Sequence, residues 1–132
     1  MSRRLAREVA LRTLFQMDIG HITKEDAFNF ALETTPLSEE LIPFAEDLVN
    51  LAIEHQAESD AIIKAKSVDW SLERLPRVDR SILRLAIGEM LAEIGTPTGV
   101  IINEAVELAH RYGTEESGRF INGLLGNLAR DG

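Results

Sequence analysis

The sequence predicts an all-α protein with six or seven helices, and three observations support this fold class. Apolar residues recur with a period of about 3.6 along most of the chain, which is typical of helices with one buried face. Strand-like alternation of apolar and polar residues is nowhere long enough to compete with that pattern. Glycine, proline and capping residues interrupt the pattern at short intervals, so short loops are expected between the helices.

Three helical segments are expected in the first half of the chain. The first covers about residues 3–17 and ends near Gly20, because glycine commonly follows the last helical residue. Thr23 begins the second segment as the first residue of a capping box, and Pro36 closes it. The longer apolar pattern that follows is expected to break near residues 55–59, where its register falters.

The second half begins with a short connector at residues 70–76 that should contain one helical turn. The clearest helix of the chain follows at residues 78–94, and its apolar stripe is wide enough to predict a central, mostly buried position. Residues 95–97, Gly-Thr-Pro, end this helix. Two more helices are expected, one from near residue 103 to 112 and one over residues 114–128.

Basic residues gather at the beginning of this acidic chain. Residues 1–12 hold four arginines and one glutamate, a local charge of +3, whereas the whole chain carries −8. Arg3, Arg4 and Arg7 are related by helical i,i+3 and i,i+4 steps and are expected to form one cluster. The dipole at a helix N-terminus disfavours each cation by about 0.3–1 kcal/mol, so helix stability does not explain them. An external anion does, and a nucleic-acid backbone fits best.

The rest of the chain is expected to repel nucleic acid. Residues 18–73 contain thirteen acidic residues and three lysines, a charge of −10. An acidic protein binds RNA or DNA only at a local basic edge, so a basic partner is expected to assist. Arg12 should contribute less than the other arginines, because Glu8 stands four residues before it and can neutralise it.

Several classes of function have no support in the sequence. The chain has no cysteine, which excludes disulfides, thiolate metal sites and thiol nucleophiles. Its three histidines have no metal-ligand spacing, and no glycine-rich phosphate loop is present. No apolar stretch approaches the roughly 18–20 residues that span a bilayer, and the N-terminal arginines precede no signal-peptide pattern. We therefore expect a cytoplasmic protein that is not an enzyme and uses no metal or cofactor.

Three motifs occur in order along the second half of the chain: VDRSILR at residues 78–84, PTGVIINEAVELA at 97–109 and RFINGLL at 119–125. Together with the N-terminal arginine cluster, they resemble the bacterial NusB family of transcription antitermination factors. The resemblance extends from one end of the chain to the other. Because several separate motifs agree in order, the resemblance is far more specific than any one motif.

The resemblance implies an all-helical fold with two packed subdomains, at about residues 1–55 and 56–132. It implies binding of single-stranded boxA-type RNA together with the ribosomal protein NusE, mainly on rRNA operons and within an RNA polymerase antitermination complex. Whether the free protein is a monomer or a homodimer stays open. The expected RNA contacts are Arg3, Arg4, Arg7, Arg119 and Tyr112, and the expected NusE contacts are Asp79 and Phe15.

Two other functions remain open on the sequence alone. The chain resembles the RNA-binding domain attached to some rRNA cytosine methyltransferases, although it is too short to include the methyltransferase. It is also compatible with a helical adaptor whose arginines contact an acidic protein and that does not bind RNA. Trp70, the single tryptophan, is expected in the core rather than stacked on a base, because tryptophan is highly buried on average.

Two polar or small residues in the motifs have structural interpretations. Asn103 is interpreted as a helix N-terminal cap, and one of the two glutamates that follow it is expected to pair with Arg80 or Arg84. Gly123 lies inside a helical pattern, where glycine costs about 1 kcal/mol relative to alanine. A close helix–helix contact is therefore expected at Gly123.

Overall fold

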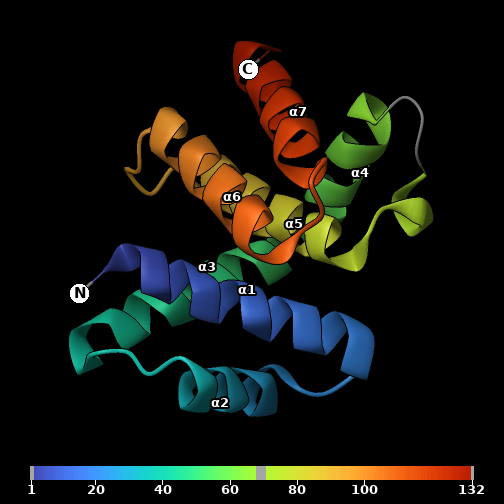
Figure 1. Cartoon of the computed structure of the whole chain (residues 1–132). Helices are drawn as coiled ribbons and strands as arrows, with labels where there is room; N and C mark the ends of the chain where they lie inside the picture. The colour runs from blue at the N-terminus through green and yellow to red at the C-terminus, as the bar shows by residue number, and fades with distance from the viewer. Residues whose placement is uncertain (1, 68–70, 132) are drawn as a thin grey trace.

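A computed structural model describes residues 2–67 and 71–131, and all regular structure in these ranges is helical (Figure 1). This confirms the all-α prediction. Trp70 lies outside the described residues. The α-helices are α1 (Arg3–Gly20), α2 (Lys24–Thr34), α3 (Ile42–Glu54), α4 (Gln56–Lys66), α5 (Arg77–Ala92), α6 (Thr98–Tyr112) and α7 (Ser117–Asp131), with short 3₁₀ turns η1 (Glu39–Leu41) and η2 (Leu72–Arg74).

Side-chain caps begin the first two helices. The Ser2 hydroxyl accepts a hydrogen bond from the Leu5 amide, and Thr23 accepts one from the Asp26 amide, as the predicted capping box requires. The end of α1 differs from the prediction, because Gly20 is still helical. His21 takes the left-handed conformation instead, with φ of 53°, and its amide bonds to the Met17 carbonyl.

The predicted start of α6 near Asn103 is wrong. The helix begins at Thr98, directly after Pro97, whose carbonyl accepts the amides of Val100 and Ile101. Proline suits this N-cap place because it has no backbone N–H that needs a partner and its own backbone is extended, with φ of −59° and ψ of 139°. Asn103 therefore lies within the helix and is exposed, so it does not cap the N-terminus.

Helix α5 lies at the centre of the molecule, as its wide apolar stripe predicts. It contacts α1, α3, α4, α6 and α7, and Figure 1 shows it between α1–α3 on one side and α4, α6 and α7 on the other. Gly88 permits the closest of these contacts. A Cβ atom at Gly88 would lie 2.9 Å from the Cα atom of Ala52, so α3 and α5 touch backbone to backbone.

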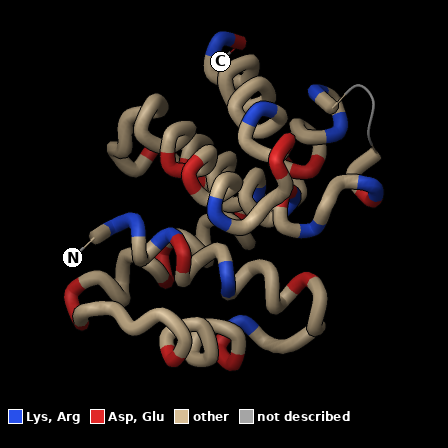
Figure 2. Tube along the Cα trace, viewed as in Figure 1, with Lys and Arg blue, Asp and Glu red and all other residues tan. Residues whose placement is uncertain are grey.

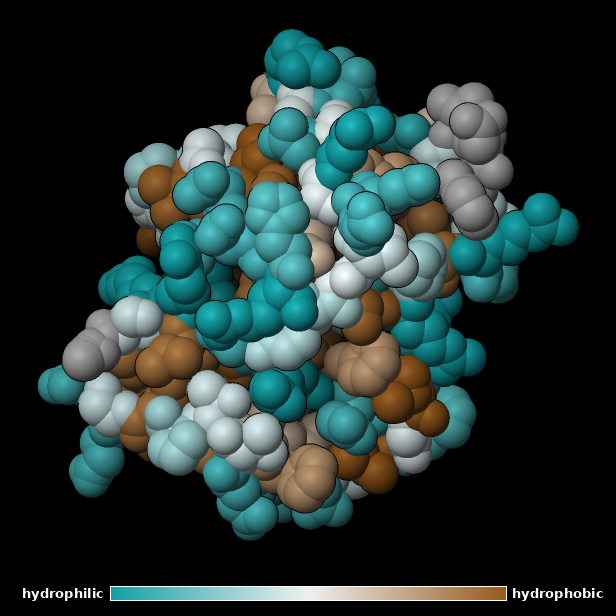
Figure 3. Space-filling model, viewed as in Figure 1, coloured by the Kyte–Doolittle hydropathy of each residue, from teal (hydrophilic) through white to brown (hydrophobic). Residues whose placement is uncertain are grey.

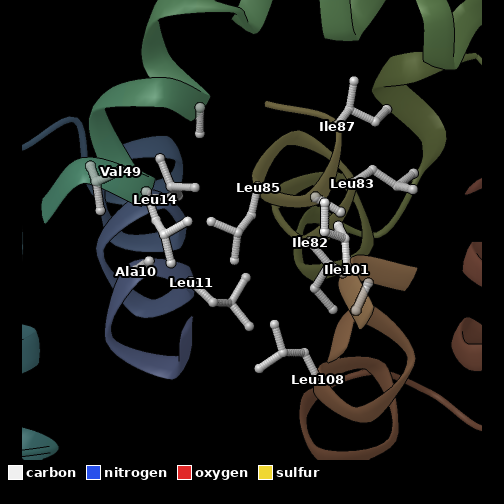
Figure 4. Close-up of a cluster of buried hydrophobic side chains, with 14 of the residues drawn as sticks. Ala10, Leu11, Leu14, Val49, Ile82, Leu83, Leu85, Ile87, Ile101 and Leu108 are labelled. Carbon is white, nitrogen blue, oxygen red and sulfur yellow. The ribbon is translucent and has the colours of Figure 1, made fainter. Parts of the chain in front are cut away.

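The buried apolar side chains form one core to which all seven α-helices contribute. In Figure 4, Leu11 and Leu14 of α1 face Leu85 of α5, while Ile101 and Leu108 of α6 complete the other side. This core continues across the boundary expected near residue 55, so the two-subdomain division stays a prediction. In the described part of the chain, no helix has the length and apolar character needed to cross a membrane.

Candidate nucleic-acid interface

The first turn of α1 presents two exposed arginines on the surface. Arg3 lies over the Phe44 ring, with its guanidinium carbon 4.3 Å from the ring centroid. Arg4 donates two hydrogen bonds to the carboxylate of Glu104 on α6, at 3.1 and 3.0 Å, and lies 3.8 Å from Glu107. These hydrogen bonds raise the pKa of Arg4 and keep its charge fixed. Figure 2 shows the basic start of α1 below the acidic turns of α6.

Arg7 does not join this exposed pair. Its side chain is only 5% exposed, and its guanidinium contacts the buried carboxylate of Glu89 on α5 at 2.7 Å. It also lies against the Phe44 ring, 5.4 Å from the centroid. The expectation of one surface cluster is therefore wrong for Arg7, because i,i+4 spacing did not reveal that α5 covers this side of α1. Because Arg7 is buried and paired, we do not expect it to contact RNA.

A polar network joins the middle of α1 to the end of α6. The buried carboxylate of Glu8 accepts hydrogen bonds from the Tyr112 hydroxyl at 2.6 Å and from Arg111 at 2.5 Å. Burial, and then the hydrogen bond to Glu8, raise the pKa of Tyr112. Arg12 donates to the same hydroxyl at 3.3 Å and lies over the ring. Glu8 thus holds Tyr112 and Arg111, and the expected pairing of Glu8 with Arg12 is wrong.

Arg119 lies in the first turn of α7 and is exposed. It stands between two hollows of the surface. One is a groove of 460 Å³ between α6 and α7, which we call the α6–α7 groove; it is lined by Gly99, Ile102, Asn103, Val106, His110, Gly118, Arg119 and Asn122. The other, of 420 Å³, lies where α7 begins beside α5 and is lined by Leu75, Pro76, Asp79, Thr114, Glu116, Ser117, Arg119 and Phe120.

The two residues expected to contact NusE lie in different surroundings. Asp79 is 4% exposed and accepts a hydrogen bond of 2.7 Å from the hydroxyl of Ser117. Burial raises the pKa of Asp79, and the Ser117 hydrogen bond opposes this rise. Phe15 is half-buried and lines an apolar pocket of 200 Å³ together with Phe30 and Tyr112. Only Phe15 offers a sizeable side-chain surface, whereas Asp79 has the contacts of a structural carboxylate.

Two further expectations are corrected by the packing. Arg80 binds Asp18 at 2.7 Å and Arg84 binds Asp60 at 2.8 Å, so neither pairs with the glutamates of α6. The fold brings α1 and α4, rather than the exposed face of α6, beside these arginines. Gly123 has open space around it: a Cβ atom there would meet no atom within 4 Å. The expected close helix contact at Gly123 is therefore wrong.

Sequence reasoning missed three residues that shape this surface: Glu8, Glu89 and Arg111. A signal existed for Glu89, because it lies seven residues after Ile82 on the apolar stripe of α5 and must be buried with a partner. Arg111 directly precedes Tyr112, although nothing in the local pattern connects it to Glu8, more than one hundred residues away.

Across the face shown in Figure 3, hydrophilic side chains gather where α6 crosses α1, and apolar patches lie toward the edges. Exposed arginines stand at both sides of this region, Arg4 on α1 and Arg119 on α7. An anion could meet a cation at Arg4 and another at Arg119, whereas the carboxylates of Glu104 and Glu107 on α6 would repel it.

Comparison with known proteins finds similar sequences over the whole length of this chain. A model of the NusB family matches residues 4–130. The transcription antitermination protein NusB of Heliobacterium modesticaldum is 46% identical over 131 residues, which are 99% of this chain and 64% of that protein. The chain thus spans just under two thirds of that relative. NusB of Bacillus velezensis is 44% identical over 99% of this chain and 98% of its own length.

A solved structure is also similar to this chain. The crystal structure of the antitermination factors NusB and NusE in complex with dsRNA contains a chain with a TM-score of 0.89 and 27% identity. The match covers 98% of this chain and 97% of the other. Both relatives are named as transcription antitermination proteins.

Proposed function

The chain belongs to the NusB family, and from this premise we propose that it binds boxA-type RNA together with the ribosomal protein NusE. On this proposal it acts on the nascent transcripts of rRNA operons as part of an RNA polymerase antitermination complex. The observation that carries the proposal is the similarity, over 98% of the chain, to a structure in which antitermination factors NusB and NusE are in complex with dsRNA.

The charges of the described residues support the RNA part of the proposal. Arg3, Arg4 and Arg119 are exposed at helix N-termini, where the helix dipole disfavours cations. Arg4 pairs with Glu104 and Arg3 lies over the Phe44 ring, whereas no ion pair of Arg119 occurs among the described residues, so Arg119 is the cation that an external anion explains best. Arg111 adds a fourth guanidinium, whose side chain is 60% exposed although it contacts Glu8.

The net charge supports the need for a basic partner. A charge of −8 on the whole chain repels RNA over distances of about a Debye length, roughly 8 Å at physiological salt. A basic ribosomal protein on the acidic surface would reduce that repulsion and add cations beside the arginines. The half-buried Phe15 and its apolar pocket are the best candidates for this protein contact, because aromatic residues are enriched at interfaces.

The proposal is tested by titrating fluorescently labelled boxA-type RNA with this protein, with NusE, and with both at several salt concentrations. We expect weak binding by this protein alone and tighter binding by the pair, with a gain that shrinks as salt rises. A scrambled RNA of equal length is the control for sequence preference. Binding of NusE without any RNA binding by the pair would instead identify a protein adaptor and contradict the proposal.

A further inference from the structure

The α6–α7 groove is an open depression of the surface with a mixed polar and apolar lining. The groove has a volume of 460 Å³ and is open to solvent along most of its length, so it could hold a flat group laid on its surface but could not enclose one. Apolar side chains of Ile102 and Val106 form part of its lining, and polar groups converge on it from both helices. Such a combination is typical of sites that hold a flat, partly polar group.

Two amides flank the groove from opposite sides. Asn103 projects from α6 and Asn122 from α7, and both are exposed. No side-chain hydrogen bond among the described residues uses either amide. Each amide therefore keeps two donors and one acceptor oxygen available for a ligand. Paired donors and acceptors of this kind match the edges of nucleobases, and asparagine matches adenine best.

One end of the groove carries an aromatic ring. His110 lies against Gly118, where a Cβ atom would approach its Nε2 atom to 2.8 Å. Only glycine therefore lets the imidazole pack onto the backbone of α7. The His110 side chain is 64% exposed, so much of its ring is open to solvent beside the groove, and its Nδ1 atom lies 3.6 Å from the carboxylate of Glu107. Unpaired RNA bases commonly stack on exposed histidine and other aromatic rings.

The groove also borders Arg119, and one of the two helices that form it, α6, contacts Arg4. On α6, Asn103 is next to Glu104, which holds Arg4 of α1. On α7, Asn122 stands one turn after Arg119, so both project from the same helix face. An RNA strand whose phosphates contact Arg119 would therefore have the groove beside it and could turn a base into it.

We propose that the α6–α7 groove is a base-reading site, which holds one unstacked RNA base, preferentially adenine, against His110 and the amides of Asn103 and Asn122. This inference rests on the proposed RNA-binding function and adds to it the place where base identity is recognised. Arginine contacts to phosphates give affinity without sequence preference, so a site of this kind is where a preference for boxA-type RNA would arise.

The test compares the wild-type protein with the Asn103→Ala/Asn122→Ala double variant, each in complex with NusE. The affinities for boxA-type RNA and for a scrambled RNA of the same length are measured across a salt series. We expect the double variant to lose about tenfold in affinity for boxA-type RNA and little for the scrambled RNA. Its salt slope should stay unchanged, because no phosphate contact is removed.

Two control variants show what the loss of an amide elsewhere and the loss of a cation would do. Asn29→Ala removes an exposed amide on α2, far from the groove, and should change neither affinity. Arg119→Ala removes a cation at the edge of the groove and should weaken binding of both RNAs alike, with a salt slope lower by about 0.7. Circular dichroism and thermal unfolding of each variant check that the fold is retained.

Three results would overturn the inference while the proposed function stands. In the first, the double variant prefers boxA-type RNA over scrambled RNA as strongly as the wild type does. In the second, it loses the same affinity for both RNAs. In the third, it loses NusE binding but keeps its preference for boxA-type RNA. The last result would make the groove a protein contact. If the wild-type complex itself fails to bind boxA-type RNA, the proposed function and the inference fall together.

Discussion

The guanidinium of Arg7 and the carboxylate of Glu89 form an ion pair of 2.7 Å that is almost completely enclosed, with side chains 5% and 1% exposed. The pair joins α1 to the central helix α5, and the Phe44 ring lies beside it. Neither charge can be removed alone without leaving its partner unpaired in the interior. Arg7 therefore belongs to the architecture, although it stands in a sequence of arginines that suggests RNA binding.

Arg7→Ala should destabilise the protein by about 3–5 kcal/mol, because the substitution leaves the Glu89 carboxylate buried without a partner. Urea unfolding followed by circular dichroism measures this loss. Arg3→Ala is the matched control. Its loss should stay below about 1 kcal/mol, since only an exposed contact with Phe44 is removed. Equal stabilities of the two variants would show that the buried pair contributes nothing.

Arg3→Ala/Arg4→Ala should weaken RNA binding by the complex with NusE and lower the salt slope by about 0.7 for each phosphate that is no longer neutralised. We expect this loss because both guanidinium groups are exposed at the start of α1 and can contact phosphates directly. Arg74→Ala, which removes an exposed arginine from η2, should leave binding unchanged. If the double variant binds like the wild type across the salt series, these arginines do not contact RNA.

Glu104→Gln should increase RNA affinity by about two- to fivefold, because the carboxylate of Glu104 competes with phosphate for Arg4 and an ion pair at the surface is weak. Fluorescence titration of labelled RNA measures the gain. Glu58→Gln removes the same charge from an exposed position on α4. A gain of equal size in both variants would indicate long-range charge alone and would contradict competition at Arg4.

Gly88→Ala and Gly123→Ala should change stability in opposite directions. At Gly88 the added methyl group would collide with the backbone of Ala52, and such overpacking costs about 1–3 kcal/mol. At Gly123 the methyl group meets open space, so the better helix propensity of alanine should stabilise the protein by up to about 1 kcal/mol. Thermal unfolding of the two variants measures both changes. A shift of both melting temperatures in the same direction would contradict the prediction.

Asp79→Asn should change the pH dependence of stability. Burial raises the pKa of Asp79 in the folded protein above its ordinary value of 3.8, so the folded state holds this proton more tightly than the unfolded state does. Wild-type stability therefore loses a contribution as pH rises from about 3.8 through the raised pKa, and the asparagine variant lacks this loss. The difference in unfolding free energy, variant minus wild type, should grow across that window and then level.

Ser117→Ala provides a second variant for the same carboxylate. It removes the hydrogen bond that lowers the pKa of Asp79, so the decline in stability should extend to higher pH than in the wild type. Urea unfolding at a series of pH values measures both variants. Parallel curves for the wild type and Asp79→Asn would show that Asp79 titrates alike in the folded and unfolded states.

Local patterns were sufficient for much of the helical organisation. The Thr23 cap, the break at His55 and the central place of α5 follow from capping chemistry, register and the width of an apolar stripe. The start of α6 could not be predicted from these patterns. Asn103 is a good cap by residue type, and only the backbone conformation shows that the helix already begins after Pro97. Caps depend on backbone conformation, which residue type only biases.

The sequence by itself determined the fold class, the family and the gathering of arginines in the first turns of α1, because these depend on periodicity and on residues close together in the chain. Only the tertiary structure decided which charges face solvent. Arg7 meets Glu89, Glu8 meets Arg111 and Tyr112, and Arg4 meets Glu104, all across separations of more than eighty residues. A charge is stabilised by whichever partner packing brings within a few ångströms, and helical spacing carries no information about that partner.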